Sequence, residues 1–249
     1  MLNILLCGCG GRMGAAVASA AEAAGDRIVA GIDVNPAAAS PYPVYASPEE
    51  FQGHADVMID FSHHSALPAL LAYALRTGTP LVVATTGHTD EEMAMMREAS
   101  AKVPVFFSRN MSLGINLLIS LCRRAAATLG EDFDIEIIEK HHNQKLDAPS
   151  GTALMIADAL SEDAEHPYVY DRHAVRKKRE RGEIGLHAVR GGNIVGEHEV
   201  MFCGQNEIVT LSHSAASREV FATGALRAAR FMQGKGPGFY NMDDVIGTL

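Results

Sequence analysis

Short apolar runs alternate with longer helical stretches through the first 110 residues, and this alternation most limits what the chain can fold into. The runs consist mainly of apolar residues, whereas Ala, Leu, Met and Glu dominate the stretches between them. This order is typical of parallel strands joined by crossover helices, so we predict a doubly wound α/β sheet. The predicted strands are Ile4–Cys7, Arg27–Ile32, Val57–Phe61, Leu81–Ala84 and Val103–Phe107. The predicted helices are Arg12–Ala24, Ser65–Thr77 and Thr89–Lys102, with Ser65 and Thr89 as N-caps.

The pattern changes after Asn110, where a long helix is followed by strands of β-branched residues. Gly-Gly and Gly-Gln-Asn turn signals separate the later strands, which predicts an open, mixed or antiparallel sheet. The predicted elements are helix Leu113–Leu129, strand Asp134–Glu139, helix Thr152–Leu160, strands Gly185–Val189, Ile194–Phe202 and Glu207–Ser212, and helix Ser217–Gln233. We expect one domain from residues 1–110 and 217–249, whose last helix returns to cover it, and a second α+β domain from 111–216.

Charge and cysteine content exclude several classes of function. The 249 residues carry a formal net charge of −9, which disfavours nucleic acid and anionic membrane surfaces as partners. The basic run Arg172–Arg181 has no interleaved aromatic residues, so we expect a solvated loop there. None of the four cysteines forms a C-x-x-C pair, which indicates reduced thiols and no zinc site. The first apolar run is too short for a signal peptide or a membrane span, so we expect a cytoplasmic protein.

A glycine-rich loop directly follows the first predicted strand and opens the first predicted helix. Free N–H groups at a helix N-terminus bind a pyrophosphate, and glycines let the backbone approach it closely. The spacing fits G-x-x-G-x-x-G and departs from strict G-x-G-x-x-G because position 13 is Met. The context predicts a Rossmann-type dinucleotide site rather than a tight structural turn. The predicted contacts in this loop are Gly8, Gly10, Gly11, Arg12, Met13 and Gly14.

Further cofactor contacts are expected where later strands end. Asp33 follows the second strand and matches the acidic residue that binds the ribose 2′-hydroxyl, which favours NADH. Arg12 is able to meet a 2′-phosphate, so NADPH also stays open. The ends of the fourth and fifth strands lie at the edge where doubly wound sheets bind ligands. The candidates there, expected to flank the nicotinamide, are Ala84, Thr85, Thr86, Ser108, Arg109, Asn110 and Met111.

A fifteen-residue run from Glu139 to Ala153 concentrates the groups that carry acid–base chemistry. In extended backbone only one of His141 and His142 faces a given site, so the other is left to bind or orient. Residues 150–152, Ser-Gly-Thr, start a predicted helix whose N–H groups and Thr152 hydroxyl suit a carboxylate. Lys145 adds a positive charge and a possible acid. A metal site is disfavoured because no further ligand signal accompanies the two histidines.

This run is similar to the E-x-H-H-x-x-K-x-D-A-P-S-G-T signature of the 4-hydroxy-tetrahydrodipicolinate reductase family, and further segments resemble that family in the same order along nearly the whole chain. The resemblance implies a Rossmann domain plus a substrate domain with an open mixed sheet, assembled as a homotetramer through those sheets. It implies NADH- or NADPH-dependent reduction of a small cyclic dicarboxylate in lysine (diaminopimelate) biosynthesis. It also implies Lys145 and His141 as the proton donor and its partner, in an order left open. The substrate contacts it implies are His142, Lys145, Ser150, Gly151 and Thr152, with Arg190 as a supporting group.

Two alternatives remain beside this family. Another small Rossmann dehydrogenase, for instance one acting on aspartate, would show the same fold pattern but leaves the dicarboxylate pocket unexplained. A nucleotide-binding sensor without turnover would keep the fold as well. Intact Lys145 and His141 argue against the sensor, and an assay of hydride transfer separates it from an enzyme.

Overall fold

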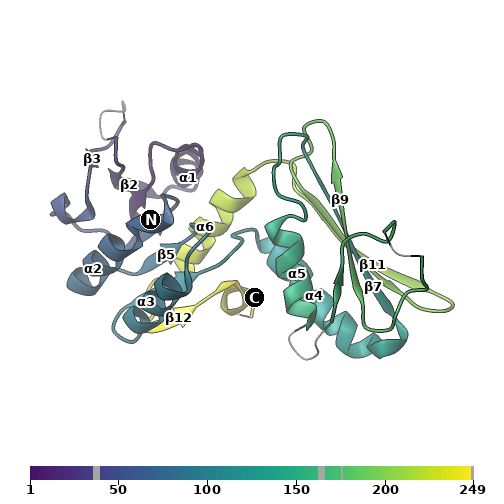
Figure 1. Ribbon diagram of the computed structural model, residues 1–249. Helices are drawn as coiled ribbons and strands as arrows, with labels where there is room; N and C mark the ends of the chain where they lie inside the picture. Colours follow the sequence, from purple (N-terminus) through teal and green to yellow (C-terminus); the bar gives the residue numbers. More distant parts are fainter. Residues whose placement is uncertain (36–39, 162–165, 175, 248–249) are drawn as a thin grey trace. The chain divides into compact units, whose positions relative to one another are not determined.

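The computed structural model describes residues 1–35, 40–161, 166–174 and 176–247, and these divide into two compact units (Figure 1). Unit 1 comprises Met1–Leu113 and Glu219–Leu249, and unit 2 comprises Gly114–Arg218. The division expected from the sequence fell after residues 110 and 216. The last two residues of the expected first domain, 248–249, lie outside the described residues. The C-terminal segment from Glu219 onward thus belongs to the same unit as the N-terminal strands.

Sheet A of unit 1 consists of parallel strands, which confirms the predicted doubly wound sheet. The order across the sheet is β12-β6-β5-β4-β1-β2-β3, and every neighbouring pair runs parallel. The strands are β1 (Asn3–Cys7), β2 (Arg27–Ile32), β3 (Val44–Tyr45), β4 (Val57–Asp60), β5 (Leu81–Val83), β6 (Pro104–Phe107) and β12 (Gly238–Tyr240). The sequence prediction lacked β3 and β12 because runs of two and three residues carry no measurable periodicity.

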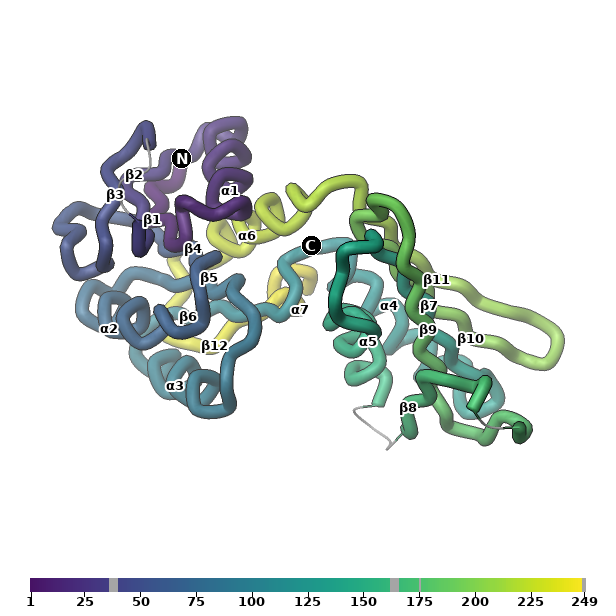
Figure 2. The backbone as a smooth tube through the Cα atoms, turned by 45° about the horizontal axis from the view of Figure 1, so that its top comes forward, coloured from purple at the N-terminus to yellow at the C-terminus, as the bar shows by residue number. Residues whose placement is uncertain are grey.

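Helices cover both faces of sheet A (Figure 2). They are α1 (Arg12–Ala23), α2 (Leu67–Thr77), α3 (Asp90–Ser100), α6 (Glu219–Phe231) and α7 (Met242–Ile246), with 3-10 turns at Pro48–Glu50 and His64–Ala66. Side chains of β1 alternate between two cores: Ile4 and Leu6 pack with α1 and α6, whereas Leu5 and Cys7 pack on the α2 and α3 side. Burial on both faces explains why the strand reads as a continuous apolar run.

The two predicted helix caps had different outcomes. Thr89 caps α3 in a full capping box, in which its side chain accepts the Glu92 N–H and the Glu92 carboxylate accepts the Thr89 N–H. The prediction for Ser65 is wrong: it lies inside the 3-10 turn, and α2 begins at Leu67 without a side-chain cap. The reason is Pro68, whose fixed φ suits the first helical turn and moves the start of α2 downstream.

Unit 2 is a mixed sheet with helices on one face, which confirms the predicted second α+β unit (Figure 1). The order of sheet B is β11-β10-β7-β9-β8, with β7, β8 and β9 parallel and β10 antiparallel to its neighbours. The strands are β7 (Asp134–His141), β8 (Tyr168–Val169), β9 (Ile184–Arg190), β10 (Glu197–Cys203) and β11 (Ile208–Ser214). The covering helices are α4 (Leu113–Leu129) and α5 (Gly151–Ser161), and a 3-10 turn spans Gly130–Asp132.

One expectation for unit 2 needs correction, and another gains detail. The strand predicted from Ile194 starts only at Glu197, because the turn through Gly192, with φ +50°, leads into backbone that has not yet joined the strand. The described residues of the basic run form irregular backbone and are exposed except Arg179, as expected for a solvated loop. Within it, Arg172 binds the carboxylates of Glu136 and Glu183, and Arg179 binds those of Asp134 and Glu136. Position 175 within the run lies outside the described residues. These arginines neutralise acidic side chains at the start of β7, which further reduces their availability for phosphates.

Candidate functional site

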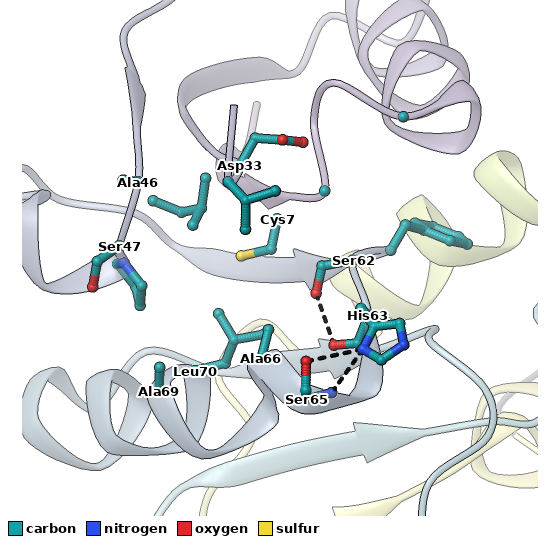
Figure 3. A pocket seen from close by; sticks show the side chains of 16 residues that line it. Cys7, Asp33, Ala46, Ser47, Ser62, His63, Ser65, Ala66, Ala69 and Leu70 are labelled. Atoms are coloured by element: carbon teal, nitrogen blue, oxygen red, sulfur yellow. Dashed lines mark hydrogen bonds between the residues drawn. The ribbon is translucent and has the colours of Figure 1, made fainter. Parts of the chain in front are cut away.

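The glycine loop forms one wall of a cavity at the carboxyl edge of sheet A (Figure 3). The cavity has a volume of about 540 Å³. Gly8 has φ +75°, and a Cβ there would lie 2.5 Å from the carbonyl oxygen of Phe61. A Cβ at Gly14 would lie 2.4 Å from the carbonyl oxygen of Gly8. The loop therefore needs glycine at both positions before any ligand is considered.

Asp33 projects from the end of β2 beside this loop (Figure 3). One carboxylate oxygen accepts the Gly10 N–H at 2.9 Å, and the other accepts the Asn35 N–H at 3.0 Å. A carboxylate offers about four acceptor positions, so it has capacity for hydroxyl groups in addition. Asp33 thus both orders the loop and presents an acceptor to the cavity.

The predicted cofactor residues separate into three groups. Gly8, Gly11 and Asp33 line the cavity. Gly10, Arg12, Met13 and Gly14 belong to the same loop and first helical turn but are not among its lining residues. The residues after β5 and β6 also lie outside this lining: the Thr85 hydroxyl donates to buried Asp60 at 2.8 Å, and Ser108 donates to the Asn110 carbonyl at 2.7 Å. Those two hydroxyls order the loops that carry them.

Part of the cavity wall was missed from the sequence. Phe61, Ser62, His63 and Ser65 follow β4 and line the cavity. Ser62, His63 and Ser65 lie across it from Asp33 (Figure 3). A polar run directly after a buried strand was the available signal, because parallel strands end at one edge. A further stretch, Ala46–Pro48, follows the two-residue strand β3 that the sequence pattern did not reveal.

The second polar cluster lies in unit 2, where β7, β9 and β10 meet the start of α5. The Glu139 carboxylate is fully buried and accepts from His141 Nδ1 at 2.6 Å and from the Ser150 N–H at 3.0 Å. Arg190 adds two hydrogen bonds to it, each 2.7 Å. His198 lies against His141 with ring centroids 5.2 Å apart, and its Nε2 is 3.0 Å from the Ser150 hydroxyl. The fold thus brings His141, Ser150 and Arg190 to one carboxylate.

Burial, hydrogen bonds and neighbouring charges together set the pKa values of this cluster. Burial raises the pKa of Glu139, but hydrogen bonds from Arg190 and His141 outweigh it, and the net pKa is lowered. For His141, burial lowers the pKa, the Glu139 carboxylate raises it, and Lys145 and Arg190 lower it, with a net lowering. Burial and the neighbouring His141 lower the pKa of His198 to about 4. His198 is therefore a neutral imidazole at neutral pH.

The loop between β7 and α5 carries Lys145, whose Nζ lies 2.8 Å from an Asp147 carboxylate oxygen. That hydrogen bond lowers the pKa of Asp147, against a smaller effect of burial. The His142 ring nitrogen Nε2 accepts a hydrogen bond from Arg218 at 3.4 Å. The residues predicted to bind carboxylates therefore include one cation, Lys145, and have a second, Arg218, beside His142.

The start of α5 modifies one expectation. Gly151 and Thr152 form its first turn, as predicted. Ser150 is already committed: its N–H donates to Glu139, and its hydroxyl accepts the Ala153 N–H at 3.1 Å and contacts His198. Ser150 therefore works mainly as the helix cap, because the adjacent strands supply partners for both of its polar groups.

Within residues 1–35, 40–161, 166–174 and 176–247, no group of three His, Cys, Asp or Glu side chains is arranged to hold a metal ion. All four cysteines are free thiols. No helix in that part of the chain is both long and apolar enough to cross a membrane.

Fold and site together define a two-domain α/β protein of the dinucleotide-binding oxidoreductase type. The family models for dihydrodipicolinate reductase match both halves, the N-terminal model over residues 2–111 and the C-terminal model over residues 114–246. The chain belongs to the dihydrodipicolinate reductase family.

Individual relatives agree with this assignment. A 4-hydroxy-tetrahydrodipicolinate reductase from Caldanaerobacter subterraneus subsp. tengcongensis is 52% identical over 249 residues, covering 99% of this chain and 98% of the relative. A dipicolinate-bound dihydrodipicolinate reductase from Paenisporosarcina sp. TG-14 has the same fold, with TM-score 0.81, 24% identity and 97% coverage of both chains. An aspartate dehydrogenase from Thermotoga maritima shares the fold at TM-score 0.55 and 12% identity, covering 94% of this chain and 98% of that one. The fold alone therefore does not separate the two activities, whereas the family models and the sequence identity do.

Proposed function

We propose that the chain is an NADH- or NADPH-dependent 4-hydroxy-tetrahydrodipicolinate reductase of lysine (diaminopimelate) biosynthesis. The observation that carries the proposal is 52% identity to such a reductase over 99% of this chain, together with a polar cluster that contains His141 and Lys145. The substrate, a reduced nicotinamide and one proton give tetrahydrodipicolinate, the oxidised nicotinamide and water. The bound cofactor supplies the hydride, and the residues of this chain bind, orient and transfer the proton.

The cavity at the edge of sheet A fits a dinucleotide. Gly8 and Gly14 permit the close backbone packing that shapes the loop, and Asp33 offers an acceptor beside it. We assign cofactor binding to the glycine loop, Asp33 and the ends of β5 and β6, as predicted from the sequence. These residues are Gly8, Gly10, Gly11, Arg12, Met13, Gly14, Asp33, Ala84, Thr85, Thr86, Ser108, Arg109, Asn110 and Met111.

Changing Asp33 to Ala should weaken NADH more than NADPH. The carboxylate accepts hydroxyl hydrogen bonds worth about 1.5–3 kcal/mol, so the NADH dissociation constant should rise about 10- to 100-fold. NADPH should lose less, because its 2′-phosphate is repelled by the same carboxylate. Nucleotide fluorescence titration measures both constants, with exposed Glu22→Ala as the matched control. Equal losses for the two nucleotides would remove the ribose role from Asp33.

We assign proton transfer to Lys145 and His141, and substrate binding to Lys145, His142, Gly151 and Thr152, with Ser150 capping the helix that presents the last two. The substrate is a dianion, so its carboxylates need the positive charge of Lys145 and the N–H groups at the start of α5. The lowered pKa of His141 favours the neutral ring, which suits it to accept or relay a proton near neutral pH.

We further propose a cytoplasmic homotetramer assembled through sheet B. Helices α4 and α5 cover one face of this sheet. The opposite face carries apolar Ile138, Val189 and Met201 among charged side chains, and Val189 is 45% exposed. Association through that face would bury them. Analytical ultracentrifugation tests the assembly, and a monomer of 26.6 kDa at micromolar concentration would contradict it.

The test of the function is oxidation of NADH and NADPH, followed at the nicotinamide absorbance, with freshly made 4-hydroxy-tetrahydrodipicolinate supplied by its synthase. Turnover that needs both the nucleotide and the dicarboxylate is the expected result. Binding of nucleotide without turnover would instead support a sensor.

A further inference from the structure

The buried Glu139 carboxylate receives four hydrogen bonds from three residues in different parts of unit 2. Its oxygen Oε2 receives hydrogen bonds from His141 Nδ1 and Arg190, and its oxygen Oε1 receives them from the Ser150 N–H and Arg190. Each oxygen therefore has two donors, which fills its acceptor capacity. A fully buried, fully satisfied carboxylate of this kind holds its neighbours in one geometry.

The same ion pair fixes both ends of the loop that carries Lys145. Ser150, at the loop's end, donates its N–H to Glu139. Arg190 donates to the Asp147 carbonyl at 2.6 Å while it binds Glu139. His141, the last residue of β7 before the loop, is bound to the same carboxylate. The proposed acid–base pair, His141 and Lys145, is thus tied to one buried anchor.

The contact between Glu139 and His141 also selects a tautomer. An ionised carboxylate only accepts hydrogen bonds, so Nδ1 of His141 carries the proton. The other ring nitrogen, Nε2, is left to exchange a proton with a ligand. Nε2 lies beside Gly196, where a Cβ would come within 3.1 Å, so the missing side chain keeps space open at this atom.

We propose that Glu139, neutralised by Arg190, is the positioning residue of the reaction: it fixes His141 as the Nδ1–H tautomer and holds the Lys145 loop in register with it. This inference rests on the proposed function for its kinetic test. The sequence placed Glu139 at the start of the signature run but gave it no role, because its partner Arg190 lies 51 positions away.

The charges around His141 predict opposite effects for the two partners. It faces Glu139 on its own strand, Arg190 on β9, His198 on β10, and Lys145 in the following loop. Glu139 raises the His141 pKa and Arg190 lowers it. Glu139→Gln should therefore move the His141 limb of the pH–kcat profile to lower pH, whereas Arg190→Gln should move it to higher pH.

The kinetic experiment measures kcat, KM and nucleotide affinity across pH for Glu139→Gln, Arg190→Gln and Arg190→Lys. We expect kcat of Glu139→Gln to fall on the order of 100-fold, with the NADH dissociation constant unchanged. Arg190→Lys retains the charge and should restore the limb but not the full kcat, because lysine lacks the bidentate fork. The matched control is Glu197→Gln, which removes an ion pair with Lys140 on the same strands. Limbs that stay in place in both Gln variants, with activity lost only as the fold is lost, would overturn the proposal.

A second measurement needs neither turnover nor a variant. Nitrogen-15 chemical shifts of the His141 ring, followed with pH in the wild-type protein, report the tautomer directly. A protonated Nδ1 in the neutral ring is expected, and an Nε2–H tautomer would overturn the inference. If the protein fails to reduce the dicarboxylate yet shows the Nδ1–H tautomer, the proposed function fails and the positioning by Glu139 stands.

Discussion

Lys145→Ala should lower kcat by about 10²- to 10⁴-fold, the range expected for loss of a positioned acid. The ammonium lies in the loop between β7 and α5, 2.8 Å from Asp147, and is 21% exposed. Alanine removes the ammonium that we propose as the proton source, together with the positive charge proposed to bind the dianionic substrate. Steady-state oxidation of NADH with the dicarboxylate measures the loss.

The same variant should leave the nucleotide affinity unchanged, because Lys145 belongs to unit 2 and the glycine loop to unit 1. Lys178→Ala, a lysine exposed on the surface of unit 2, is the matched control and should keep full activity. Loss of NADH binding in Lys145→Ala would contradict its assigned role. A normal kcat with a raised KM would reduce Lys145 to a substrate contact.

Gly8→Ala should destabilise the protein by about 2–5 kcal/mol and abolish measurable nucleotide binding. A left-handed backbone costs an L-residue about 1–2 kcal/mol, and overpacking costs about 1–3 kcal/mol more. Both apply at Gly8, since φ is +75° and a Cβ would lie 2.5 Å from the Phe61 carbonyl oxygen. Relief of that overlap requires movement of the loop to which we assign cofactor binding.

Gly25→Ala separates the two effects. Gly25 has nearly the same φ, +73°, but nothing lies within 4 Å of a Cβ built there. It should therefore show only the backbone cost, about 1–2 kcal/mol, with nucleotide affinity intact. Urea unfolding and NADH titration of the two variants give both quantities. Equal destabilisation by the two substitutions would mean that the close approach to Phe61 carries no energetic weight.

The accuracy of the sequence prediction followed local information. Strand Arg27–Ile32 and helix Leu113–Leu129 were predicted with their observed bounds, because each has a long apolar pattern with clear ends. Thr89 was identified as a cap because its partner Glu92 is three residues away. Ser65 failed because Pro68 competes for the helix start. The short edge strands β3, β8 and β12 were missed because their residues pair with distant strands and carry no local signal.

The candidate site divides in the same way. The glycine loop, Asp33 and the run from His141 to Thr152 were identified from the sequence, because their chemistry is concentrated within a few consecutive residues. Glu139 and Arg190 are 51 positions apart and meet only because β7 and β9 pair in parallel. His198 reaches Ser150 in a similar way, since β10 lies beside β7.

The sequence by itself determined the fold class and the family, and it supplied the candidate groups for dinucleotide binding and proton transfer. Those features depend on residue type and short-range spacing, which the chain carries in its linear order. Only the tertiary structure decided that Ser150 is committed to capping, that Arg172 and Arg179 are paired, and that one buried carboxylate orients His141. Hydrogen bonds between paired strands and the loss of water around them set those outcomes, and neither is encoded at short range.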